Sequence, residues 1–154
     1  MEVVPYWVII PYGFVERLVI LDFVCAASDI KIKRLKLVIA SLVGLFLTLA
    51  IRAVFQGNYF VTALSSIIST VAIVWIFTGL TGVRVWVSST TAIFIITMFE
   101  FLLFSYATEQ LLKTFDFIFV WILTGIPHIA ALFVISLFIK RVKGNYAMRK
   151  EETT

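Results

Sequence analysis

Five apolar blocks, each long enough to cross a lipid bilayer, make up most of this 154-residue chain. They cover approximately residues 4–27, 36–55, 60–80, 85–106 and 116–139. A helix needs roughly 20 residues to cross about 30 Å of hydrocarbon. Because 62% of the residues are hydrophobic, little chain is left for a water-soluble domain. The sequence therefore predicts an all-α integral membrane bundle of five transmembrane helices within residues 1–143, followed by a short cytoplasmic tail over 144–154.

The basic residues predict the orientation of this bundle. Lysine and arginine are enriched in cytoplasmic loops of membrane proteins. Here they cluster between blocks one and two, between blocks three and four, and after block five: Lys31, Lys33, Arg34, Lys36, Arg84, Lys140, Arg141, Lys143, Arg149 and Lys150. We therefore expect a multi-pass protein of the cell membrane with its N-terminus outside and its C-terminus inside. The first block contains Glu16, Arg17 and Asp22, so we expect it to be retained and not cleaved as a signal peptide.

The motifs that usually carry catalysis are not found in the sequence. It has no Gly-rich phosphate loop, no Cys-x-x-Cys, no His-Glu-x-x-His and no Gly-x-Ser-x-Gly. A single cysteine, Cys25, and a single histidine, His128, make neither an internal disulfide nor a histidine metal cluster. We expect no enzymatic activity, no cofactor and no metal. The net charge of +4 is explained by membrane topology, so no nucleic-acid partner is expected.

Charged side chains inside the apolar blocks are the main indication of function. An ionisable group at the centre of a bilayer costs at least roughly 2.5–3.5 kcal/mol, so each needs a partner, a water-filled cavity or a role. Glu16 and Arg17 lie in the outer third of the membrane if the first helix starts near Pro11, and near its middle if it starts near Val4. The ionisable residues inside the apolar blocks that need such an explanation are Glu16, Arg17, Asp22, Arg52 and Glu100.

The carboxylates among these residues outnumber the guanidinium groups by one. A proton, a bound cationic ligand, or a contact between Asp22 and the basic first loop would each relieve the surplus. By depth, Arg52 and Arg17 are the expected partners of Glu100. Asp22, Cys25 and Asp29 recur at helical spacing, so we expect them to face the bundle interior.

Further polar residues mark helix contacts and a hinge. Ser66 and Thr70 lie on a hydroxyl-rich side of the third block, which suits close helix contacts, within the chain or with another chain. Pro127 permits a kink in the fifth helix, and His128 follows it as a polar core residue.

The pattern resembles the N-terminal membrane sensor region of bacterial histidine kinases of the peptide quorum-sensing type and their sporulation-phosphotransferase-like relatives. The resemblance runs over about residues 14–143. It rests on Phe14-Val15-Glu16, the basic loop from Lys31 to Lys36, Ile51-Arg52, Glu100 and Ile126-Pro127-His128. It implies a membrane region that perceives an outside signal and passes a helix movement through its last span. The residues after Lys143 carry no phosphoacceptor histidine or ATP-binding motif, so the output would be supplied by another protein.

We therefore expect a non-enzymatic membrane sensor, or signal-perceiving subunit, that binds a ligand or partner protein through polar groups in the outer half of the bundle. The expected residues are Glu16, Arg17, Arg52 and Glu100. The alternatives are a small transporter or proton-coupled channel subunit, and a structural subunit of a larger membrane complex that uses Ser66 and Thr70 as a contact surface. Expected partners are anionic lipid headgroups at the basic loop and tail and another membrane or cytoplasmic protein. Whether the chain forms a homo-oligomer stays open.

Overall fold

The computed structural model describes residues 5–54, 59–111 and 117–151, and within these ranges the chain folds into five α-helices without a strand. The helices are α1 (Tyr6–Ala27), α2 (Arg34–Val54), α3 (Tyr59–Thr78), α4 (Val83–Leu111) and α5 (Phe117–Glu151). Their apolar residues recur all around the helices, as expected for helices that are surrounded by protein or lipid. The prediction of an all-α bundle is confirmed.

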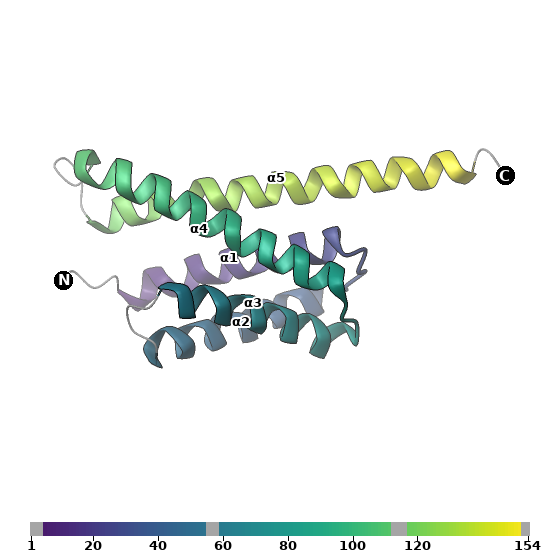
Figure 1. The fold of residues 1–154 in the computed structure, drawn as a ribbon, viewed down its shortest axis with the longest axis horizontal. Helices are drawn as coiled ribbons and strands as arrows, with labels where there is room; N and C mark the ends of the chain where they lie inside the picture. The colour runs from purple at the N-terminus through teal and green to yellow at the C-terminus, as the bar shows by residue number, and fades with distance from the viewer. Residues whose placement is uncertain (1–4, 55–58, 112–116, 152–154) are drawn as a thin grey trace.

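Helix α1 is the central element of the bundle. It contacts all four other helices, which follow one another around it in the order α2, α3, α4 and α5 (Figure 1). The core lies where α1 meets its neighbours, and Ile20 and Val24 of α1 and Leu132 of α5 are almost completely buried there. The most charged of the five predicted spans is thus the one that the other helices enclose.

The ends of the helices follow local sequence signals. Helix α1 ends in a Schellman motif, in which Asp29 takes a left-handed conformation (φ 61°) and the Ile30 N–H donates to the Cys25 carbonyl at 2.9 Å. Gly79, at φ 71°, closes α3 in the same conformation, which glycine adopts without steric cost. Asp29 therefore lies beyond the end of α1, and its side chain is half exposed. The prediction that Asp29 faces the bundle interior is wrong.

The bounds of α1 and α5 bear on the predictions about function. Helix α1 begins at Tyr6 and continues through Pro11, so Glu16 and Arg17 lie at its centre. This corresponds to the second of the two alternatives for the first span. Helix α5 has 35 residues and continues to Glu151, well past residue 139, where the predicted fifth span ends. At 1.5 Å per residue it is about 52 Å long, and it extends beyond the other helices at its C-terminal end (Figure 1).

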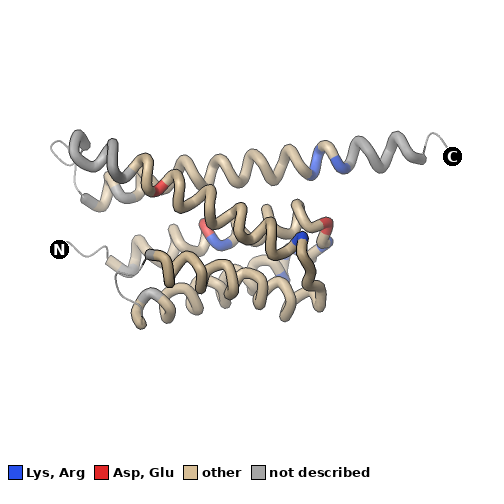
Figure 2. Tube along the Cα trace, in the orientation of Figure 1, with Lys and Arg blue, Asp and Glu red and all other residues tan. Residues whose placement is uncertain are grey.

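Four of the helices, α2 to α5, contain stretches that are long and apolar enough to cross a membrane. Helix α1 has 22 residues, a sufficient length, but carries three charged side chains. Large apolar side chains cover the outside of the bundle, as on a lipid-facing surface, among them Phe46, Ile68, Trp75, Phe94, Phe101 and Phe138. Figure 2 shows basic residues gathered at the end of the bundle opposite the N-terminus and an adjacent acidic and basic pair midway along α1.

Candidate functional site

Arg17 is the buried charge at the centre of the bundle, with only 5% of its surface exposed. Its guanidinium donates to the Ser66 hydroxyl at 3.2 Å and to the Thr70 hydroxyl at 3.4 Å. These two residues are four apart on α3, so their side chains point in the same direction. These two hydrogen bonds tie the charged centre of α1 to α3.

The neighbouring helix α2 packs beside this arginine at Gly44. A Cβ atom at Gly44 would lie 3.6 Å from Arg17 Cδ and 3.1 Å from Ile73 Cδ1. Glycine at this position thus avoids a tight contact with Ile73 of α3, while the aliphatic part of Arg17 lies at an ordinary van der Waals distance. The Thr48 hydroxyl, one turn further along α2, donates a hydrogen bond to the Gly44 carbonyl at 2.7 Å, and this bond lies within α2.

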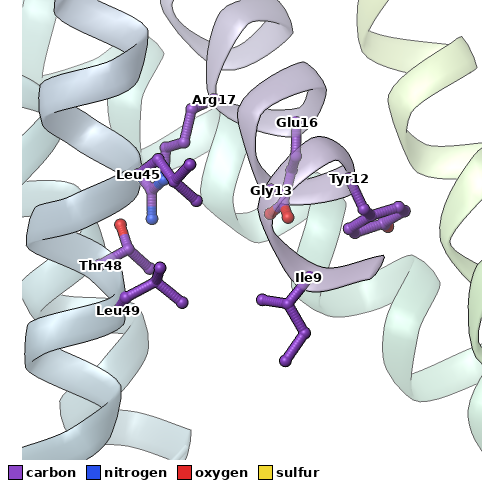
Figure 3. Close-up of a pocket in the computed structure, with 8 residues that line it drawn as sticks. All are labelled: Ile9, Tyr12, Gly13, Glu16, Arg17, Leu45, Thr48 and Leu49. Carbon is purple, nitrogen blue, oxygen red and sulfur yellow. The ribbon is translucent and has the colours of Figure 1, made fainter. Parts of the chain in front are cut away.

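A small cavity of about 20 Å³ lies between α1 and α2. Arg17 and the half-buried Glu16 both line it, together with Thr48, Tyr12 and four other residues, as Figure 3 shows: Ile9, Gly13, Leu45 and Leu49. Adjacent residues on a helix do not face each other, and Glu16 and Arg17 leave α1 in different directions. The volume suits one water molecule, which would need two to four polar partners. A carboxylate and a guanidinium thus border the same small cavity.

Tyr12 connects this site to α5. It lies one turn before Glu16 on α1, and its hydroxyl is 3.1 Å from Nε2 of His128, with the two rings edge to face at 86°. His128 is fully buried, and its Nδ1 has no hydrogen-bond partner within the described part of the chain. A Cβ atom at Gly125 would lie 1.9 Å from the Tyr12 hydroxyl, so glycine is required for the tyrosine to reach the histidine.

Asp22 makes a second connection between α1 and α5. Its carboxylate accepts hydrogen bonds from the Ser136 hydroxyl at 2.6 Å and from Lys140 Nζ at 2.6 and 2.7 Å. The sequence had left open whether a proton, a ligand or the basic first loop relieves the surplus carboxylate. Asp22 is therefore bonded to side chains of α5 and not of the first loop. Helix α5 packs along α1, whereas the first loop begins beyond the end of α1.

A third connection lies at the end of α1. Lys143 Nζ donates to the carbonyls of Ala26 and Ala27 at 2.8 and 3.3 Å and forms an ion pair with Asp29 at 2.5 Å. Arg84 of α4 reaches the same carboxylate at 3.2 Å. The hydrogen bond from Lys143, with the positive charges of Lys143 and Arg84, lowers the pKa of Asp29 below its usual value.

The structure brings only some of the predicted site residues together. Glu16 and Arg17 share the cavity, and His128 lies near it through Tyr12. Pro127 is half-buried inside α5, next to His128. Glu100 lies on α4 with an exposed side chain.

Three of the predicted residues need separate comment. The backbone of Arg52 belongs to α2, and its side chain lies outside what the structure describes. Ser66 and Thr70 are buried and bonded to Arg17, so the hypothesis that they form a surface for another chain is wrong. The physical reason is that α3 turns its hydroxyl-rich side toward the charged central helix.

Sequence reasoning missed Tyr12, Gly125, Ser136 and Lys140. Tyrosine and glycine are ordinary residues in membrane helices, so neither carries a signal by itself. A weak signal was the helical spacing of Tyr12 with Glu16 and of Gly125 with His128. Lys140 was assigned to the cytoplasmic end because it follows the predicted end of the fifth span.

Comparisons of the sequence with protein-family models and with curated proteins, and of the structure with solved structures, find no match. Within the residues that the structure describes, no three His, Cys, Asp or Glu side chains lie close enough to hold a metal ion. Fold and site therefore define the class: an all-α helical bundle, with four helices apolar enough to cross a membrane and a polar site at the centre of its first helix.

Proposed function

We propose that this chain is a non-enzymatic, five-span protein of the bacterial cell membrane that perceives a signal through α1 and passes it on through α5. In this proposal α1 crosses the membrane together with α2 to α5, because Arg17 is enclosed by the other helices and Asp22 is paired with Lys140. Both arrangements lower the cost of placing charge in a bilayer. The N-terminus lies outside and the C-terminus inside, because the basic residues gather at the end of the bundle opposite the N-terminus.

The observation that carries the proposal is the set of polar contacts between α1 and α5. They lie at three levels along α1: Tyr12 with His128, Asp22 with Ser136 and Lys140, and the last turn of α1 with Lys143. Helix α5 then continues beyond the bundle to Glu151. A helix that is bonded along its length to the central helix, and that projects from the bundle, is suited to carry a displacement to a partner protein.

The signal would act on the polar groups around Glu16 and Arg17. A ligand or partner that offers a charge near this site would change the balance between the Glu16 carboxylate and the buried guanidinium. Binding shifts a conformational equilibrium only by its difference in affinity for the two states, and a buried charge makes that difference large. Tyr12 lies one turn from Glu16 and would transmit the change to His128, where Pro127 permits α5 to bend. Glu100 and Arg52 are further candidates for the signal-binding surface.

This reading agrees with the resemblance to sensor-kinase membrane regions, in which the last span leads to the output. The recipient of the signal is another membrane or cytoplasmic protein that contacts the projecting part of α5. A transporter would need a path across the bundle, whereas the cavity beside Glu16 has a volume of only about 20 Å³.

The proposal is tested by native mass spectrometry of the protein extracted gently from its native membrane. We expect one stoichiometric partner protein, with weaker association in the Glu16→Gln and Glu100→Gln variants. Lys36→Gln is the control, since it also removes one charge but lies exposed at the start of α2, which makes no contact with α5. A bare chain that supports pH-dependent ion flux in liposomes would contradict the proposal and favour a channel.

A further inference from the structure

An open groove of about 540 Å³ lies at the basic end of the bundle. It is bounded by α4 on one side and by Lys143 of α5 on the other, and Phe23 and Ala27 of α1 form part of its lining. Figure 1 shows α4 and α5 close together at one end and diverging toward this end. The volume lies within the roughly 300–1,000 Å³ that small-molecule sites occupy.

The groove is amphipathic. Its apolar part is lined by Phe23, Val83 and Val87, and the last two are exposed on one face of α4. Its polar rim consists of Arg84, Lys143 and Asp29, with 78% of the Arg84 side chain and 40% of the Lys143 side chain exposed. Charged groups thus gather where the helices end, and apolar groups continue toward the middle of the bundle.

The rim carries a net positive charge that Asp29 balances only in part. Arg84 and Lys143 both reach the Asp29 carboxylate, so the two cations are held close together. Further basic residues surround this end of the bundle: Lys31, Lys33, Arg34, Lys36 and Arg141. Arg84 and Lys143 together carry one positive charge more than Asp29 neutralises, and a phosphodiester supplies a negative charge that the fork of an arginine can bind with two hydrogen bonds.

We propose that this groove binds one anionic phospholipid. The phosphate lies between Arg84 and Lys143, in exchange for part of their contact with Asp29, and an acyl chain lies along Phe23, Val83 and Val87. The lipid would then bridge α1, α4 and α5 at the level of the headgroups. This site depends on membrane insertion of the bundle but not on the signal-perceiving role proposed above.

The experiment is a lipid titration of the purified full chain in detergent, followed by native mass spectrometry, with phosphatidylglycerol and phosphatidylcholine as probes. We expect one phosphatidylglycerol bound in preference to phosphatidylcholine. Arg84→Gln should weaken phosphatidylglycerol binding about fivefold, the effect of one cation near an anionic headgroup. Arg141→Gln is the matched control, because Arg141 is exposed at the same end but does not line the groove. We expect its binding to change less than about twofold.

Two more variants separate the groove from a merely basic surface. Asp29→Asn should tighten phosphatidylglycerol binding, because the two cations lose their internal partner while asparagine still tolerates the left-handed backbone at this position. Val87→Trp should weaken binding of both lipids by filling the apolar part. Thermal unfolding confirms that each variant is folded.

Three results would overturn the proposal. Equal binding of the two lipids by the unmodified chain would show that the rim does not select an anion. Equal losses in Arg84→Gln and Arg141→Gln would indicate a diffuse basic surface. Displacement of the lipid by free glycerol phosphate would show that the site binds a soluble phosphate compound. Loss of the lipid site with the partner protein still bound would leave the proposed function intact.

Discussion

Single side chains decide how this bundle tolerates charge. Arg17 is buried and donates to two hydroxyls of α3, and Asp22 is paired with Lys140. Charges inside apolar blocks are conspicuous, so the sequence alone singles out Glu16, Arg17 and Asp22. Their partners could not be predicted, because a serine or threonine in an apolar helix is as often bonded to its own backbone. Thr70 accepts a hydrogen bond from Arg17 and also donates one to its own helix, to the Ser66 carbonyl at 2.7 Å.

The coupling between Arg17 and Ser66 is measurable. We expect Ser66→Ala to lower the free energy of unfolding by about 1.5–3 kcal/mol, since it removes a hydrogen bond to a charged group. In an Arg17→Met background the same change should cost less than about 0.5 kcal/mol, because the charge that needs the hydroxyl is gone. Denaturation of the four proteins in a double-mutant cycle provides the measurement, and equal costs in the two backgrounds would contradict the contact.

Asp29 gives the bundle a predictable dependence on pH. Its pKa is lowered in the folded state, so the unfolded chain binds the proton more tightly and the contribution of Asp29 is complete above its ordinary pKa. That contribution is lost as the pH falls through the lower, folded-state value, that is, below about pH 4. We expect the Tm of the unmodified chain to fall more steeply with acidification in this range than that of Asp29→Asn. Parallel curves would show that the ion pairs add nothing.

At the level of the helices, the sequence predicted well that five helices exist and approximately where each begins and ends. Each predicted span overlaps one helix, because long apolar runs leave little ambiguity. The end of α5 was not predicted, since hydropathy measures the fit to lipid and not helix formation. Lysine and arginine lower hydropathy after residue 139 but are good helix formers. The start of α1 could not be predicted, because proline is typical of the first turn of a helix, whereas Pro11 lies inside α1.

The crossing of α1 and α5 depends on Gly125. We expect Gly125→Ala to lower the free energy of unfolding by about 1–3 kcal/mol, because its Cβ atom would overlap Tyr12 and displace it from His128. Gly82→Ala is the control, as no atom lies within 4 Å of its added Cβ. Thermal unfolding of both variants in the same detergent tests this, and equal effects would show that α5 has room at this crossing.

The arrangement of the whole molecule was beyond sequence reasoning. The contacts that place α1 at the centre join residues far apart in the chain; Tyr12 and His128 are 116 positions apart. Apolar helices pack against one another with little preference in composition, so hydropathy does not tell which helix is enclosed. The three charges within the apolar block of α1 were an available signal, because charges in the middle of a span are less costly when protein surrounds the helix.

The orientation of the bundle can be measured with engineered cysteines. Val54 and Leu80 are exposed near opposite ends of the bundle. In a Cys25→Ser background, we expect Val54→Cys to react with a membrane-impermeant thiol reagent added outside intact cells, because the positive-inside rule places this end outside. Leu80→Cys should react only after the membrane is opened. The reverse pattern would mean that the bundle is inverted.

The central claim, that α1 controls the position of α5, is tested most directly by a distance between two spin labels. Labels at Leu80 and Arg141, in a Cys25→Ser background and in lipid nanodiscs, report the position of α5 relative to the rest of the bundle. We predict that Tyr12→Phe and Glu16→Gln each shift the distance by about 2 Å or broaden its distribution. Val15→Ala, on the exposed side of α1, should leave it unchanged. Identical distributions in all four proteins would contradict the claim.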